Sequence, residues 1–424
     1  MVPNSFEYDS GFEGRDESIY QSPLVARPTR PLNVDIIRRA FTTPVFTGLS
    51  EAIVSMKNIC AALLNPFDWK RPLAGIIVSL LAIPSQAGEN AQHEFLFFPS
   101  VELFDNTGLD DELFDSAGNI VTAGFMYSYS GNRLRFMAEY VLSTEESEIE
   151  RLTAGWLFGE QTMLWVGRFH QPSKYWTTEH HHGQYLQTSI SRPGIEEWED
   201  EGGPIPTHIT GLLLETGHIR EDSSGYQFSL SAGFAPVLTE RGLEPFEPWD
   251  PSSDHGAAVN FRLAFLPDYF GNDQFGILGG WSDIEIDSDD FASQIGTESI
   301  EQLQLGVYMN WSWEQLRIIS KVNYLENKHI RADGDFTDDF WSGYIQAEYA
   351  IGSYWTVYGR HENDSGEDDT EFLRLIPKFI SHRNVFGVRW DVAKSHALTF
   401  EIADTETLTS EFGQYRLQWS AVFP

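Results

Sequence analysis

The run Glu179-His180-His181-His182 contains the residue types that most directly suggest chemistry. Neutral imidazoles and carboxylates are common ligands of transition metals. Three adjacent histidines cannot all face one ion in an extended chain, and no further ligand stands at a suitable spacing. The sequence therefore predicts a solvated loop here, with no bound metal and no cofactor.

An acidic cluster follows the histidine run, formed by Glu196, Glu197, Glu199, Asp200 and Glu201. Rings of charged side chains select ions in pores, but an exposed acidic loop needs no such role. Both interpretations stay open, because the sequence does not place the cluster in space. His180, His181, His182 and these five acidic residues are the candidates for a segment that narrows a pore.

Basic residues form a second candidate set, because they occupy strand-like positions opposite apolar side chains. The set comprises Arg133, Arg135, Arg168, Arg262, Arg317, Lys321, Arg360, Arg389 and Arg416. Aligned on one wall of a pore, they would form a cationic ladder for anions. Paired with Glu139, Glu348, Asp391 and Glu401, they would instead brace the wall, which is the commoner role. Ion selectivity is therefore left open.

Hydrolysis is the alternative chemistry, since Ser189, Ser191, His208 and His218 supply the residue types of a Ser/His enzyme. The sequence contains neither a Gly-x-Ser-x-Gly elbow nor a His-Glu-x-x-His motif. We predict that the chain is not an enzyme. A closed barrel that acts as a lipase or protease, or as a structural or adhesive protein, remains the alternative.

The elements that must position these residues show apolar and polar side chains in strict alternation. The segments 121–129 and 134–142 alternate on either side of the short link Ser130-Gly131-Asn132, and the segments 303–313, 341–349 and 386–390 repeat the pattern. A period of two predicts β-strands with one oily face. The mean hydropathy of −0.30 and the 14% aromatic content agree with strands that separate lipid from water. A soluble antiparallel sandwich shares this alternation.

The last strand carries the same pattern, with Tyr415, Leu417, Trp419 and Phe423 on one face. A final strand that ends on phenylalanine resembles those of bacterial outer-membrane β-barrels, and Pro424 extends it by one residue. In that family the closing strand is the assembly signal. The resemblance implies location in the outer membrane and contact with its lipid, with lipopolysaccharide and with the barrel-assembly machinery.

An export signal is predicted near the N-terminus. Basic residues at Lys57, Lys70 and Arg71 precede the apolar segment 72–83, and Ser85-Gln86-Ala87 supplies a small-x-small cleavage site. The predicted signal peptide covers residues 56–87, and residues 1–55 form a disordered leader or reflect a mis-assigned start. The apolar segment is shorter than the ~20 residues of a membrane-spanning helix.

Size follows from the remaining residues 88–424, which number 424 − 87 = 337. At roughly 21 residues for each strand and its connection, they form an all-β transmembrane antiparallel barrel of about 16 strands, within a range of 14 to 18. Short links alternate with long acidic stretches at 283–298 and 326–339. A barrel of this width keeps a water-filled lumen.

The net charge of the chain and a second resemblance restrict the possible functions. The chain has 28 basic and 63 acidic residues, a net charge of −35 that disfavours nucleic acid as a partner. Gly167 to Pro172, Tyr175-Trp176, Ser191-Arg192-Pro193 and the strand 387–391 resemble large porins, including those for phosphate and related anions. The resemblance implies passive diffusion of small hydrophilic solutes or ions through a lumen narrowed by the 170–206 loop. Many such porins are homotrimers.

Overall fold

The computed structural model describes residues 91–109, 114–144, 147–180, 183–196, 203–247, 255–366, 370–376 and 378–424. The predicted leader 1–55 and signal peptide 56–87 lie outside these residues and stay predictions. None of the described helices has the length and apolar character needed to cross a bilayer.

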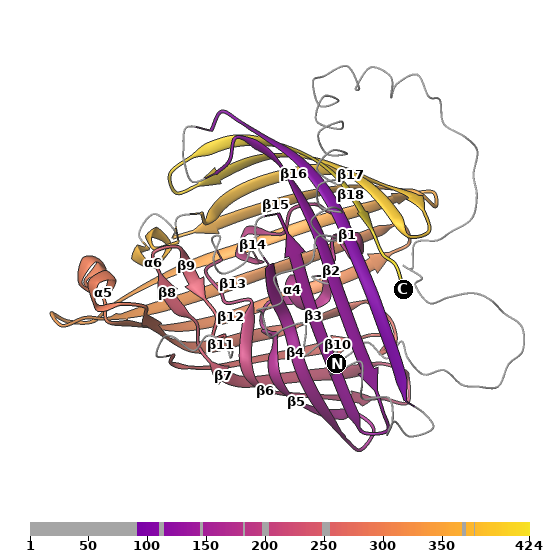
Figure 1. Ribbon diagram of the computed structural model, residues 1–424, viewed down its shortest axis with the longest axis horizontal. Coiled ribbons are helices and arrows are strands. Elements are labelled where there is room, and N and C mark those ends of the chain that lie inside the picture. Colours follow the sequence, from indigo (N-terminus) through magenta and orange to yellow (C-terminus); the bar gives the residue numbers. More distant parts are fainter. Residues whose placement is uncertain are drawn as a thin grey trace, which may run out of the picture.

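Sixteen strands of the described residues form one closed antiparallel barrel (Figure 1). They are β1 (Gln92–Thr107), β2 (Ala117–Ser130), β3 (Leu134–Ser143), β4 (Ser147–Phe158), β5 (Thr162–His170), β6 (His208–Ile219), β7 (Gly225–Phe234), β10 (Ala257–Leu266), β11 (Gln274–Ile286), β12 (Ser299–Trp313), β13 (Leu316–Ile330), β14 (Phe336–Ile351), β15 (Trp355–Ser365), β16 (Ile380–Ala393), β17 (His396–Thr407) and β18 (Glu411–Ala421). Each strand pairs with the next, β7 pairs with β10, and β1 closes the ring against β18. The predicted all-β barrel of about 16 strands is confirmed.

The alternation read from the sequence separates the two faces of this barrel. On β12, Leu305 and Val307 point outward and are exposed, whereas Gln302, Gln304 and Asn310 point inward and are buried. On β14, Trp341, Ile345 and Tyr349 are exposed in the same way. The outer face of the wall is therefore apolar and the inner face is polar, as a barrel in lipid requires.

Some strands extend farther than the ~10 residues expected for a membrane crossing. The stretch 326–339, predicted as a long loop, is instead a hairpin in which β13 runs to Ile330 and β14 starts at Phe336. Buried polar residues continue the alternation into this hairpin, where Asn327 donates to Asp338 (Nδ2–Oδ1 3.1 Å). Acidic side chains concealed the strand pattern there, because inward-facing polar residues resemble loop residues in sequence.

The closing strand β18 pairs with β17 and with β1 along its length. Beyond its end, Phe423 exchanges two backbone hydrogen bonds with Phe97 (2.8 and 2.9 Å) and stacks on the Phe97 ring. The ring of Trp419 stacks on His396 of β17. The predicted assembly-signal residues therefore lie on the seam where the first and last strands meet.

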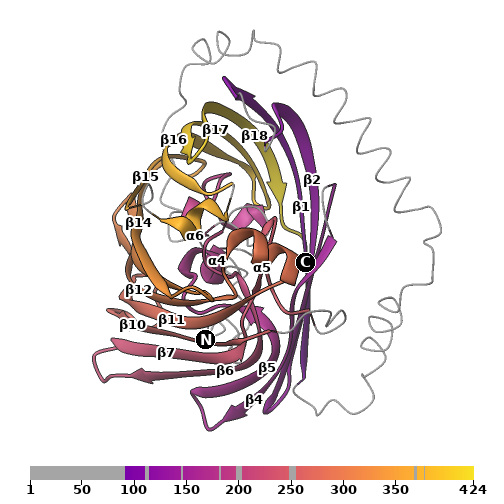
Figure 2. The same cartoon turned by 90° about the vertical axis from the view of Figure 1, so that its left-hand side faces the viewer.

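Smaller elements connect the strands at the end where the longer loops lie. They are α4 (Tyr175–His180), η2 (Gln184–Leu186) and η3 (Gly194–Glu196) between β5 and β6, β8 (Val237–Thr239) and β9 (Gly242–Glu244) between β7 and β10, α5 (Asp289–Ile295) between β11 and β12, and α6 (Glu371–Arg374) between β15 and β16. Figure 2 shows α4, α5 and α6 within the outline of the strand ring. A buried apolar cluster joins Trp176 of α4, Leu238 of β8 and Phe372 of α6 to inward-facing residues of the wall. The interior of the barrel is therefore partly filled by its own loops.

Candidate functional site

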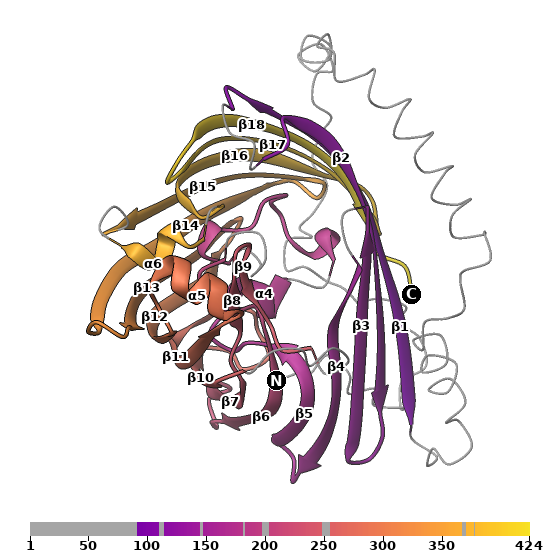
Figure 3. The ribbon, with the colours of Figure 1, turned by 60° about the vertical axis from the view of Figure 1, so that its left-hand side comes forward.

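The longest connection between barrel strands spans residues 171–207, and its described parts, 171–180, 183–196 and 203–207, fold into the barrel rather than away from it (Figure 3). Gly167 lies within β5, three residues before its end, and its φ of +132° favours glycine. A Cβ at Gly167 would lie 2.0 Å from the carbonyl oxygen of Leu152, so no other residue fits this approach of β5 to β4. Lys174 Nζ donates to Thr207 Oγ1 (2.7 Å) and ties the start of the connection to its end. These described parts of the connection are called the inner loop below.

Aromatic contacts place α4 against the wall. Tyr175 stacks on Tyr308 of β12 with a centroid separation of 4.4 Å, and Trp176 meets Tyr344 of β14 edge-on at 6.0 Å. The side chains of Tyr175 and Trp176 are fully buried, and Trp176 Nε1 donates to Gln187 Oε1 (3.1 Å). Burial raises the pKa of the Tyr175 phenol well above its usual range, with further help from Glu179. This phenol therefore stays neutral and supplies packing rather than charge.

A buried ion pair joins the inner loop to β13. Lys321 Nζ donates to Glu196 Oε1 (2.6 Å) and to the carbonyl oxygen of Ser173 (2.8 Å). Both side chains of the ion pair are 0% exposed. One lysine of the wall therefore holds two distant points of the inner loop.

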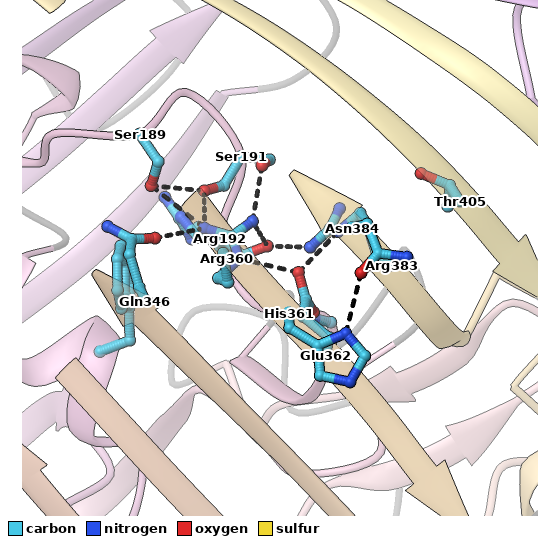
Figure 4. A network of polar contacts seen from close by, with 12 residues as sticks. Ser189, Ser191, Arg192, Gln346, Arg360, His361, Glu362, Arg383, Asn384 and Thr405 are labelled. Carbon is cyan, nitrogen blue, oxygen red and sulfur yellow. Dashed lines mark hydrogen bonds and ion pairs between the residues drawn. The ribbon is translucent and has the colours of Figure 1, made fainter. Parts of the chain in front are cut away.

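A larger polar network holds the middle of the inner loop against β15 and β16 (Figure 4). The guanidinium of Arg360 donates to Ser191 Oγ (2.6 Å), to the Ser191 carbonyl oxygen (2.9 Å) and to Glu362 Oε1 (2.8 Å). Glu362 also accepts from Arg383 Nε (2.7 Å) and from the backbone N–H of Gly194 (2.5 Å). Arg383 donates in turn to the carbonyl oxygen of Arg192. Oppositely charged side chains of the wall thus neutralise one another and also form hydrogen bonds with the loop backbone.

Two further wall residues form hydrogen bonds with other parts of the loop backbone. Glu401 of β17 accepts from the backbone N–H groups of Ile190 (2.9 Å) and Ser191 (3.2 Å). Arg389 of β16 donates to the carbonyl oxygens of Tyr185 (2.7 Å) and Gln187 (2.6 Å). Burial raises the pKa of the Tyr185 phenol, although the Arg389 guanidinium opposes this shift. The inner loop is therefore fixed from β12 to β17.

The predicted basic residues are mostly braced by carboxylates. The pairs are Arg168 with Glu148, Arg262 with Glu179, Arg317 with Glu348, Lys321 with Glu196, Arg360 with Glu362, Arg389 with Asp391 and Arg416 with Glu102. Of the expected acidic partners, Glu348 and Asp391 pair with members of this set. Glu139 pairs instead with Arg151, and Glu401 accepts from the Tyr358 hydroxyl and from backbone N–H groups of the inner loop. This arrangement favours the bracing interpretation over a continuous cationic ladder.

Two basic residues differ from the braced set. The prediction that Arg133 faces the lumen is wrong, because Arg133 lies in the exposed turn before β3. The turn is shifted by one residue from the predicted link Ser130-Gly131-Asn132, since Ser130 still belongs to β2 and β3 starts at Leu134. Arg135 lies on β3 and donates to the carbonyl oxygens of Gly131 and Leu134. Within the described part of the chain, Arg135 has no carboxylate partner.

The remaining candidates separate into described and undescribed positions. Glu196 is buried against Lys321 rather than exposed in the lumen, and His180 is buried in α4 beside Arg317 (3.5 Å). His181, His182, Glu197, Glu199, Asp200 and Glu201 lie outside the described residues. Their role in narrowing a pore stays a prediction.

The residue types considered for hydrolysis are not brought together. Ser189 Oγ accepts from Arg360 (3.1 Å), whereas His208 contacts Glu150 at the far end of the inner loop. His218 is exposed on β6. These described positions supply no Ser/His pair for catalysis.

Sequence reasoning missed several residues of the site. Glu362, Arg383 and Gln346 were not singled out, although each faces the lumen within an alternating strand. The buried group Glu150, His170 and His208 was also missed as a unit. One signal was available, because His170 and His208 stand on either side of the longest segment without strand alternation.

The wall away from the inner loop differs in exposure. Inward-facing Thr122, Met126 and Ser128 of β2 and Arg135 and Met137 of β3 are partly exposed. The corresponding residues of β12 to β16 are buried, namely Gln304, Asn323, Gln346, Arg360 and Arg383. The inner loop therefore covers one side of the interior and leaves side chains of β2 and β3 accessible.

Comparisons with known proteins agree with this architecture. No protein-family model and no curated protein matches the sequence. An anion-selective porin from Comamonas acidovorans shares the fold with a TM-score of 0.55 at 10% identity, over 79% of this chain and 100% of that one. The outer membrane channel DcaP of Acinetobacter baumannii gives 0.50 at 9% identity, over 80% and 99% of the two chains. OmpT, an outer membrane protein of Vibrio cholerae in a trimer form, gives 0.50 at 10% identity, over 79% and 100%. The chain therefore has the porin-like β-barrel fold of outer-membrane proteins, and this fold supports an outer-membrane location.

Proposed function

We propose that the chain is a porin-type channel for passive diffusion of small hydrophilic solutes or ions, narrowed by the inner loop. One observation carries the proposal. The inner loop is fixed to β12 to β17 inside the barrel, while inward-facing side chains of β2 and β3 keep partial exposure. A loop held against one wall reduces the cross-section of a wide barrel without closing it. No energy source, cofactor or catalytic step is part of this proposal.

The charges of the interior suggest weak ion selectivity. Most of the described basic residues are paired with carboxylates, so their charges largely cancel at short range. Arg135 is the exception on the accessible side. Rings of unpaired charge are what make pores strongly selective. We therefore expect a slight preference that depends on Arg135 and on the acidic residues 197–201.

The outer surface suggests the surroundings of this channel. Exposed Trp311, Trp313, Trp341, Trp355 and Trp390 stand among aliphatic side chains on the outward face. Such aromatic residues lie at the interfaces of a membrane. The proposal therefore includes outer-membrane lipid and lipopolysaccharide as neighbours and the barrel-assembly machinery as the route of insertion. It also includes a homotrimer, by analogy with the Vibrio cholerae protein described above.

Planar-bilayer recording of the chain purified from membranes tests the proposal. Stable conductance steps, with a reversal potential close to zero in a KCl gradient, are the expected result. A correctly folded barrel that never conducts would refute the channel and favour a closed enzyme or structural barrel. Heat-modifiable mobility in gels provides the control for folding, because a folded barrel migrates differently before and after boiling.

A further inference from the structure

Three buried side chains meet at the root of the inner loop. Glu150 belongs to β4, His170 is the last residue of β5, and His208 is the first residue of β6. One ligand atom from each lies within 4.8 Å of the other two. None of the three residues is more than 5% exposed. Strands β4, β5 and β6 lie side by side in Figure 1, so the group spans three neighbouring strands.

The fold brings these residues together for local reasons. His170 and His208 are direct cross-strand partners, and their rings lie 5.2 Å apart. The register between β3 and β4 shifts at Glu139 and Tyr140, which pair with Arg151 and Ile149 and leave Glu150 as an extra residue. An extra residue of this kind re-aims its side chain. The bulge therefore accompanies the placement of the Glu150 carboxylate beside the two imidazoles.

The distances fit a shared metal ion. Glu150 Oε2 lies 2.8 Å from His208 Nε2 and 3.8 Å from His170 Nε2. Ligands about 2.1 Å from a tetrahedral zinc ion stand roughly 3.4 Å from each other. The two measured separations bracket that value, and a hydrogen bond accounts for only the shorter one.

A second carboxylate lies near the other ring nitrogen of His208, beyond hydrogen-bond distance. Glu148 Oε1 lies 3.7 Å from Nδ1 of His208 and is itself paired with Arg168. Metal-binding histidines commonly have a carboxylate at the second ring nitrogen, which orients the ring and makes it a stronger ligand. Two imidazoles and one carboxylate favour a transition metal over Ca²⁺ or Mg²⁺, which prefer oxygen ligands.

We propose that Glu150, His170 and His208 bind one divalent transition-metal ion, with Zn²⁺ as the preferred ion and a fourth position left for water. The ion would link both ends of the inner loop to β4. Contacts of the loop to β12–β17 lie on another part of the wall, so the site adds an independent anchor at the root. Metal binding of this kind does not depend on whether the barrel conducts.

Titration of the full chain with Zn²⁺ tests the site. The protein is purified from membranes in detergent, stripped with a chelator and titrated calorimetrically. Co²⁺ is then used as a spectroscopic probe of tetrahedral binding. We expect one ion per chain, and at least a tenfold loss of affinity in His170→Ala, His208→Ala and Glu150→Gln. His218→Ala is the matched control, because His218 is exposed on the same strand as His208.

Glu150→Gln and one further variant separate effects on folding and competing sites from loss of the proposed site. Glu150→Gln keeps the size of the side chain, so it decides the question if an alanine variant fails to show heat-modifiable mobility. Replacement of His180, His181 and His182 by glutamine tests whether the histidine run binds the ion instead. Wild-type affinity and an unchanged Co²⁺ spectrum in Glu150→Gln would overturn the proposal, as would loss of binding confined to the histidine-run variant.

Discussion

Removal of the Lys321 ammonium is the sharpest test of how the inner loop is held. Lys321→Met keeps an unbranched side chain of similar length but deletes the charge that neutralises Glu196. Both partners are 0% exposed and their atoms are 2.6 Å apart, so water cannot replace the lost ammonium without moving the loop. The contact of Lys321 Nζ with the Ser173 carbonyl oxygen is lost as well.

The expected magnitude follows from burial. Removing one partner of a buried ion pair costs about 3–5 kcal/mol. Because each 1.4 kcal/mol is a factor of ten, the ratio of docked to undocked loop should fall by between roughly 10² and 10⁴. Arg360 and Glu401 still hold residues 189–192. The change should therefore loosen α4 and η3 while leaving the barrel intact.

Single-channel recording and limited proteolysis measure this loosening. We expect Lys321→Met channels to show larger conductance or frequent transitions between levels, together with faster cleavage within the inner loop. Lys328→Met is the matched control, because Lys328 lies on the same strand in a pair that is about 40% exposed. Such surface pairs contribute at most about 1 kcal/mol.

A double variant separates charge from shape. Lys321→Met combined with Glu196→Met replaces the buried pair by apolar side chains, an exchange that is often neutral. Recovery of wild-type noise and protease resistance is the expected result. The reasoning would be refuted if Lys321→Met alone behaved as wild type, or if the double variant were more disturbed than the single one.

Three further predictions concern the wall. Arg135→Gln should shift the reversal potential in a KCl gradient toward cation preference, while Arg133→Gln, in the exposed turn, should leave it unchanged; equal shifts would contradict the placement of Arg135. Val307→Arg, on the outward face of β12, should cost about 2–4 kcal/mol in unfolding from lipid vesicles, whereas Trp313→Arg near the strand end should cost no more than about 1 kcal/mol. Trp419→Asp or Phe423→Asp should block assembly at the seam with β1, and a heat-modifiable barrel in the membrane fraction for both variants would count against the role of the terminal strand.

The barrel could be predicted from the sequence because its signal is local. Between Leu303 and Trp313, outward-facing apolar residues alternate with inward-facing, mostly polar ones. The period of two alone indicates the two environments. The strand number followed from chain length, because short and long connections average out to roughly 21 residues for each strand with its connection. The boundaries of the closing strand β18, from Glu411 to Ala421, were also accessible to the same reasoning.

The contacts of the inner loop could not be predicted in this way. Lys321 and Glu196 are 125 positions apart in sequence, and their pairing depends on how the loop turns inside the barrel. The acidic cluster was therefore considered as a filter, although its first member is buried in an ion pair. The hairpin at 326–339 was missed for a related reason, because inward-facing Asn327 and Asp338 resemble loop residues when their partners are unknown.

Side chains of the wall hold the inner loop largely through the main-chain atoms of the loop. Arg389 and Arg383 donate to carbonyl oxygens of residues 185, 187 and 192, and Glu401 and Glu362 accept from the backbone N–H groups of residues 190, 191 and 194. Main-chain atoms are present whatever the side chain. Many side chains of this segment can therefore be exchanged while the path of its backbone stays the same. The same barrel can in this way present different side chains to the pore.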